Sequence, residues 1–323
     1  MNLSHPHSLR MNRWYGPGPT CLQRLLLTAC LAPQEPALAA WRDWLARCSF
    51  DLEDAASMEL AAAAVARLGV AAGESSQPQR CRGWSRREWF VSELAHAAAQ
   101  QIEEECRRRS LQAVAIGDLA TLRAGRSFAG RPFALRSLEI VVPGATVADI
   151  AALDRAARSG PAGDAFGTGS LWLSIWPSGP WRSPPAVLQK TGADGAVGIA
   201  APVPAEQLAF LAAANWRRRP PGRLRWILEM LAVAGESADG TELGAAVAAI
   251  TQRDDTTAEV QAALGCIAAF PGTAAITPVA AAVLGLRASL RSRLRCWRMT
   301  TRLEPGWTQL KQRISRRVRR PKG

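Results

Sequence analysis

Residues 133–144 read FALRSLEIVVPG and predict the strand on which the fold is built. Polar Ser137 and Glu139 flank Leu138, so their side chains face the same side of an extended chain. The apolar run 140–142 and the Pro143-Gly144 pair favour a buried strand that ends at the proline. Some enzymes carry two metal-binding carboxylates at this spacing, whereas this stretch carries one. It is therefore an active site, the remains of one, or an ordinary strand.

Two further apolar runs predict strands near this one. LQAVAIGD (111–118) is a short buried run ending at Gly117, and SLWLSIW (170–176) alternates until Pro177 breaks it. Helical spacing fills the connections at 119–123 and 145–158, with Thr146 as the expected N-cap of the second helix. Together they predict a strand–helix–strand–helix–strand core, within the size range of a small α/β domain.

The rest of the chain has helical periodicity. Helices are expected at 21–32, 37–48, 57–70 and 84–109, with Asp51 or Asp54 capping the third and SSQPQ (75–79) forming a loop. From residue 204 the pattern is again helical. We expect an α+β fold dominated by helix, with a small mixed sheet flanked by N- and C-terminal helical regions.

The chain has 323 residues, of which 48% are hydrophobic. Changes in composition and the Pro- and Gly-rich breaks divide it into five parts. These are a flexible arm (1–19, where Met1 or Met11 is the start), a helical region (20–110), the α/β core (111–203), a second helical region (204–286) and a basic amphipathic tail (287–323).

Cysteine and histidine give no sign of a metal or redox site. The seven cysteines are scattered without a C-x-x-C pair, which favours reduced thiols in a cytoplasmic protein. His96 stands alone in a helical run and is read as an ordinary helix residue. No segment approaches the roughly 20 apolar residues of a membrane span, so we expect a soluble or peripheral protein.

The net charge of +13 is concentrated in the tail. Residues 287–322 hold thirteen Lys and Arg against Glu304 alone, which leaves +12 there. One interpretation is that the tail is a solvated extension without a binding role. The functional interpretation is that the tail binds the anionic phosphate groups of a membrane or a nucleic acid. Leu and Trp stripes between the arginines favour peripheral contact with the inner membrane over nucleic acid, because an amphipathic helix buries such stripes at the lipid boundary. The candidate surface-binding residues are Arg313, Arg316, Arg317, Arg319 and Arg320.

Five strings, in this order, resemble a bacterial family of uncharacterised nucleotidyltransferase-like proteins of the DNA polymerase β superfamily. They are ALAAWRDWLARC (37–48), AIGD (115–118), RSLEIVVP (136–143), LWLSIW (171–176) and RLRWILEML (223–231). The resemblance implies a nucleotidyltransferase fold, with Gly117 and Asp118 in the nucleotide-binding turn. It also implies two-metal phosphoryl transfer, in which aspartates hold two Mg²⁺ ions.

The chain departs from the family pattern at the positions of the metal-binding aspartates and of the motif lysine. Ser137 replaces the first aspartate, Glu139 the second, and the third falls at or near Leu173. Ile116 replaces the motif lysine, and Glu229 the downstream aspartate. A serine hydroxyl and a leucine cannot replace two anionic ligands of a hard dication.

The resemblance therefore predicts a catalytically impaired member, a pseudoenzyme that binds a nucleotide or a protein partner and needs no cofactor. It also suggests a role in a polysaccharide or peptide-modification cluster. Two alternatives stay open. One is an active Mg²⁺-dependent nucleotidyltransferase that uses Glu139 with relocated acids such as Asp118, Asp149 or Asp164. The other is a docking protein that acts through the basic tail. Considered alone, Glu139 would be a solvated strand residue, Gly117 a turn glycine, Asp118 a helix cap, and Trp172, Trp176 and Trp181 packing residues or the lining of a shallow pocket.

Overall fold

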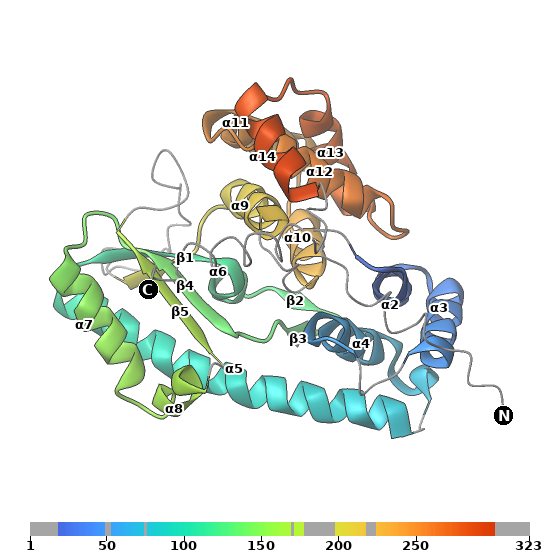
Figure 1. Cartoon of the computed structure of the whole chain (residues 1–323), viewed down its shortest axis with the longest axis horizontal. Coiled ribbons are helices and arrows are strands. Elements are labelled where there is room, and N and C mark those ends of the chain that lie inside the picture. Colours follow the sequence, from blue (N-terminus) through green and yellow to red (C-terminus); the bar gives the residue numbers. More distant parts are fainter. Residues whose placement is uncertain are drawn as a thin grey trace, which may run out of the picture.

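A computed structural model describes residues 19–48, 53–73, 76–168, 171–177, 198–217 and 224–300. Helices surround one small sheet, with the long helix α5 (Ser76–Arg108) running beneath it and the C-terminal helices above it (Figure 1). The expected helix-dominated α+β class is confirmed.

The sheet has four strands in the order β5-β4-β1-β6. β4 (Ser137–Val141) lies antiparallel to β1 (Gln112–Ile116) and parallel to β5 (Trp172–Trp176). These three strands confirm the three that the apolar runs predict. The fourth, β6 (Gly198–Ala200), pairs parallel with β1 and was not predicted, because three residues are too few to show a periodicity.

The two faces of the sheet are packed differently. Leu138 and Ile140 point into an apolar cluster formed with α5, α7 (Val147–Arg158) and the short α8 (Gly163–Gly167). Glu139 and Ser137 face the other side, where Ile116 and Val141 pack against Phe210 of α9 (Pro204–Arg217). Alternation in RSLEIVV therefore separates a fully apolar face from one that carries polar groups.

Caps explain where several helices begin. Thr146 caps α7 as predicted, in a capping box with Asp149, and Asp54 caps α4 (Ala55–Leu68). The loop predicted at 75–79 is wrong, because α5 begins at Ser76. Pro78 lies in its first turn, where a helix does not need the amide donor that proline lacks.

The helices on either side of the sheet share a second apolar cluster. From the N-terminal region it includes α2 (Cys21–Leu31), α3 (Gln34–Arg47) and α4. From the C-terminal region it includes α9, α10 (Trp226–Gly235), α11 (Gly240–Arg253), α12 (Thr257–Ala268) and α13 (Thr277–Leu284). Between the two regions runs a short hairpin of β2 (Ser127–Phe128) and β3 (Arg131–Pro132). The two helical regions therefore stabilise one another around the sheet.

One stretch, Ala55–Ala72, is by length and composition alone apolar enough to cross a membrane, contrary to the expectation from sequence. Half of this stretch, which was found among the described residues, is buried inside the fold. The predicted reduced thiols agree with the structure, since all seven cysteines are free.

Candidate functional site

The turn between β1 and α6 (Gly117–Arg123) brings the glycine of AIGD against the central strand. Gly117 has φ +59°, in the left-handed region that favours glycine. A Cβ there would lie 3.3 Å from Oε2 of Glu139, and Ile116 pairs with Glu139 in the sheet. Backbone conformation and close approach therefore both favour glycine, and the structure brings two of the predicted site residues together.

Ser137 and Glu139 lie on the same face, as predicted, and each is 7% exposed. Glu139 is therefore not the solvated strand residue of the bland interpretation. Across the parallel pairing, Ser174 stands beside Glu139 and Leu173 beside Leu138. Leu173 consequently faces the opposite, apolar side, and the neighbouring strand offers a hydroxyl, not a third carboxylate, at the Glu139 position.

Asp118 does not cap α6, since Ile116 is the N-cap and Asp118 lies one residue inside the helix. Its carboxylate instead accepts a hydrogen bond from the backbone amide of Arg136 at 3.3 Å and pairs with the guanidinium of Arg225 at 2.8 Å. Arg225 Nε also donates to Glu229 at 2.7 Å, and its Nη1 donates to the carbonyl of Ala134 at 2.6 Å. The side chains of Arg225 and Asp118 are 8% and 11% exposed, so this pair is shielded from water.

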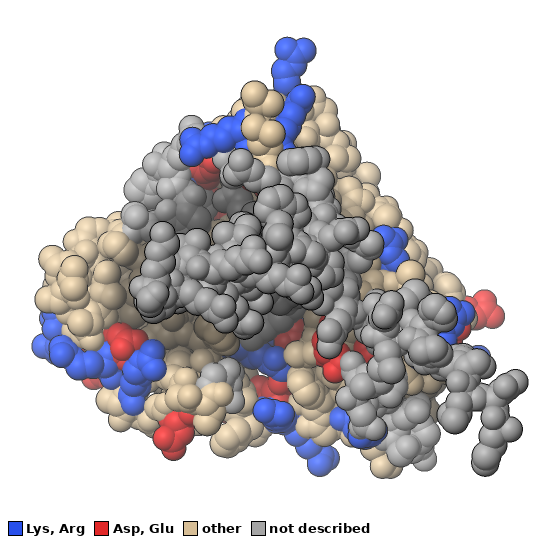
Figure 2. Space-filling model, viewed as in Figure 1, with Lys and Arg blue, Asp and Glu red and all other residues tan. Residues whose placement is uncertain are grey.

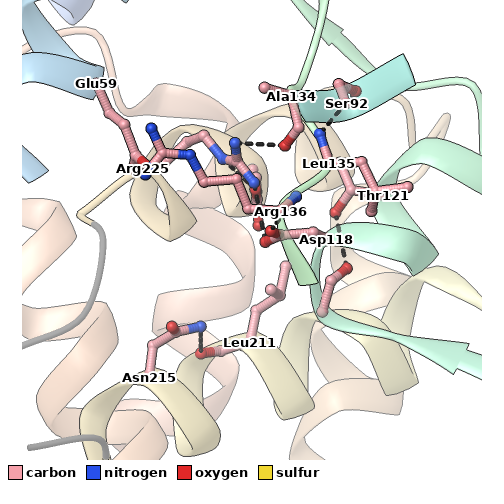
Figure 3. A network of polar contacts seen from close by, with 12 residues as sticks. Glu59, Ser92, Asp118, Thr121, Ala134, Leu135, Arg136, Leu211, Asn215 and Arg225 are labelled. Atoms are coloured by element: carbon pink, nitrogen blue, oxygen red, sulfur yellow. Dashed lines mark hydrogen bonds and ion pairs between the residues drawn. The ribbon is translucent and has the colours of Figure 1, made fainter. Parts of the chain in front are cut away.

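Arg136, immediately before β4, extends the network to the N-terminal helices. Its guanidinium pairs with Glu59 of α4 at 3.1 Å and with Glu88 of α5. Figure 3 shows Arg136 and Arg225 side by side, with Asp118 beneath them and Glu59 reaching in from α4. Buried Arg225 and partly buried Arg136 thus link α4, α5, α6 and α10 at the start of β4.

The acids around Arg225 decide its protonation. Desolvation is the largest single influence and lowers the pKa of Arg225, but Asp118, Glu229 and Glu59 together raise it more, so the net shift is upward. The guanidinium is therefore a fixed charge. A dication placed on the Asp118 carboxylate would meet this positive charge at hydrogen-bond distance, which is electrostatically unfavourable.

The other relocated acids lie away from Glu139. Asp149 accepts hydrogen bonds at the N-terminus of α7 and pairs with Arg109 at 2.9 Å. Asp164 is an exposed residue of α8. Both helices pack on the opposite face of the sheet. Within the described ranges, no three His, Cys, Asp or Glu side chains are grouped so that they could hold a metal ion.

The space beside the Gly117 turn is small. A cavity of about 10 Å³ lies there, lined by residues that include Gly117, Asp118, Arg225 and Glu229. It has room for about one water molecule. Of the tryptophans expected to pack or to line a pocket, Trp172 on the edge strand β5 is 66% exposed and Trp176 is 36% exposed, so neither lies in the core. Trp181 lies outside the described residues.

The basic tail is described only as far as α14 (Leu290–Thr300). The predicted surface-binding residues Arg313, Arg316, Arg317, Arg319 and Arg320 lie outside the described residues. In α14 itself, Ser292 is buried and hydrogen-bonded to Glu259 at 2.6 Å, while Leu290 and Leu294 are exposed. Basic side chains gather at the top of the face drawn in Figure 2, over the C-terminal helices.

Sequence patterns do not single out the two arginines. A signal nonetheless exists for Arg225, which stands four residues before Glu229 at the start of an otherwise apolar helix. Arg136 carries no comparable local signal, because its acidic partners come from helices far away in the sequence.

Comparisons with models of protein families, with curated proteins and with solved structures found no match. They therefore assign the chain to no family.

Proposed function

We propose that this chain is a nucleotidyltransferase-like protein that does not perform two-metal phosphoryl transfer and acts as a nucleotide-binding or accessory protein. The order and directions of β5, β4 and β1 support the first part, as does the left-handed glycine that joins β1 to a helix and touches Glu139. The resemblance implies the glycine before the second strand and a neighbouring strand beside the one that carries Ser137 and Glu139.

The claim that the chain does not perform two-metal phosphoryl transfer rests on the Asp118–Arg225 ion pair. Catalysis by two metals needs several carboxylates free to bind Mg²⁺. Here the acid beside the glycine turn is held by a guanidinium, and Ser137 and Ser174 flank Glu139 on its face of the sheet. The same geometry disfavours the active-enzyme alternative, because Asp149 and Asp164 lie on the far face.

Calorimetric titration of nucleoside triphosphates tests this proposal. We expect the same affinity in excess EDTA and in millimolar Mg²⁺, and no transfer of label from α-labelled triphosphate to protein or small acceptors. Glu139→Gln serves as the matched variant, and its nucleotide affinity should be equally indifferent to Mg²⁺. Binding that requires Mg²⁺ and weakens in this variant, or nucleotidyl transfer, would contradict the proposal. Absence of any binding would leave only the accessory role.

One observation favours a second function at the C-terminus. Leu290 and Leu294 are 73% and 47% exposed, one helical turn apart, and Arg291 and Arg293 beside them are exposed too. We propose that α14 and the residues after it dock on an anionic lipid surface, because such a face buries leucine at the lipid boundary and pairs arginine with headgroups.

Flotation with vesicles containing phosphatidylserine tests this docking. The full chain should float, and a chain ending at Leu286 should not. Leu290→Glu/Leu294→Glu should float less, whereas the same double change at two exposed apolar residues of α5, Trp89→Glu/Phe90→Glu, should have no effect. Equal flotation of the full and shortened chains would refute this second function.

A further inference from the structure

A large groove lies between α4, α5 and the segment around the β2–β3 hairpin, and its lining shares Arg225 with the small cavity at the Gly117 turn. It encloses about 590 Å³, within the range of small-molecule sites. The turn's own cavity is about 10 Å³. The groove is therefore much the larger of the two spaces.

One face of α5 forms a long wall of the groove. Arg82, Arg86, Trp89, Glu93 and His96 all line it. Their spacing of three or four residues places them in one stripe, which extends about 21 Å at 1.5 Å per residue. The stripe is polar and positive at its N-terminal end and aromatic in the middle.

The facing wall is apolar and partly flat. It consists of small side chains of α4 and of rings from the hairpin segment, namely Ala62, Ala63, Ala66, Phe128 and Phe133. Small residues on one helix leave room opposite Trp89, whose side chain is 62% exposed. The geometry fits a flat apolar body, because aromatic rings stack favourably on such a body.

Only some of the charged side chains that line the groove have an ion-pair partner within the described residues. Glu59 and Glu88 line it too, but each is paired with Arg136, and Arg225 is paired with Asp118. Arg82 and Arg86 are exposed, and in the described part of the chain no carboxylate lies within ion-pair distance of either. One end of the groove therefore offers two guanidinium groups, one helical turn apart, to an anion.

Two ring nitrogens of groove-lining residues also lack partners. Nε1 of Trp84 and Nε2 of His96 make no hydrogen bond within the described ranges. Buried donors are normally satisfied. A polar atom of a bound molecule would supply what the protein does not.

We propose that this groove binds a small organic anion with a flat apolar body. The anionic group lies between Arg82 and Arg86, and the body lies on Trp89 against the small residues of α4. The residues that would hold this anion belong to α4 and α5 and do not line the cavity at the Gly117 turn, so the inference does not depend on the proposed nucleotide binding.

Fluorescence titration with two matched probes tests the site. One is 8-anilinonaphthalene-1-sulfonate, an aromatic anion, and the other is N-phenyl-1-naphthylamine, which lacks the sulfonate. Arg82→Glu/Arg86→Glu should weaken binding of the anionic probe by at least about tenfold and leave the neutral probe within about twofold, since the variant removes the charge-assisted contact and adds two carboxylates that repel only the anion. Trp89→Ala should weaken both probes.

The control is Arg42→Glu/Arg107→Glu, which reverses two exposed arginines outside the groove and should change neither affinity. All three variants alter exposed side chains, so each should unfold at the urea concentration of the parent. The proposal is overturned if the Arg82/Arg86 variant binds the anionic probe like the parent. It is equally overturned if Trp89→Ala changes the affinity for neither probe. The same holds if the control variant loses as much affinity for the anionic probe as the Arg82/Arg86 variant does.

Discussion

Replacing Arg225 by methionine tests the importance of the buried network most directly. Methionine keeps much of the side-chain volume but removes the cation that holds Asp118 at 2.8 Å and Glu229 at 2.7 Å, and the donor to the Ala134 carbonyl at 2.6 Å. Two nearly buried carboxylates then lose this cation. Loss of one partner from a buried ion pair costs about 3–5 kcal/mol, so we expect the free energy of unfolding to fall by that amount.

Urea denaturation followed by circular dichroism measures the loss. The matched control is Arg158→Met, which breaks a pair with Asp154 whose side chains are 47% and 44% exposed. Exposed pairs spaced four residues apart contribute only about 0.3–0.5 kcal/mol. The triple variant Arg225→Met/Asp118→Asn/Glu229→Gln should recover at least half of the loss, because it also removes the stranded charges.

The pH dependence distinguishes stranded charge from lost packing. Without Arg225, desolvation raises the folded-state pKa of Asp118 and Glu229 above the unfolded value. Groups raised in this way destabilise the fold most when both are ionised, so the deficit of Arg225→Met should shrink as the pH falls from 7 towards 4. The reasoning is refuted if Arg225→Met loses no more stability than Arg158→Met, or if its deficit is the same at pH 7 and pH 4.

Three further outcomes follow from single residues. Gly117→Ala should cost about 1–2 kcal/mol in urea titrations and more than Gly144→Ala, since both have positive φ but only the first Cβ would meet another side chain; equal costs would contradict the close approach. Exposed Cys21 should react with a thiol reagent at pH 8 well before Cys30, because burial raises the pKa of Cys30 to about 12; equal rates would contradict this. Hydrogen bonds from its arginine neighbours lower the pKa of Glu105 to about 2, so the stability it contributes is present above pH 4.3 and is lost as the pH falls towards 2. Glu105→Gln should flatten the stability curve in that window, and an unchanged curve would argue against the ion pairs.

The strands and caps could be predicted because their signals are local. Alternation in RSLEIVVP places Ser137 and Glu139 on one face, and the structure keeps both there. Thr146 lies three residues before its capping partner Asp149, so a short window contains the whole motif. Local periodicity and capping chemistry therefore account for β1, β4, β5 and α7.

The candidate site could be predicted only in part, because its contacts join distant segments. Nothing local indicates that Asp118 pairs with Arg225, and the simplest local role for an acid at the start of a helix is a cap. Register across β4 and β5 likewise depends on pairing, which is why the neighbour of Glu139 is Ser174 and not Leu173. A resemblance in sequence order cannot supply such contacts.

A guanidinium and a metal dication both neutralise clustered carboxylates, but they differ in what else they connect. A chelator can remove a metal ion, whereas Arg225 is covalently part of the chain. Arg225 stands at the start of α10, so its ion pair with Asp118 connects the C-terminal helices to the Gly117 turn. Arg225 also lines both the small cavity at that turn and the large groove. Among the described residues, Arg225 is the one that the linings of the two spaces have in common.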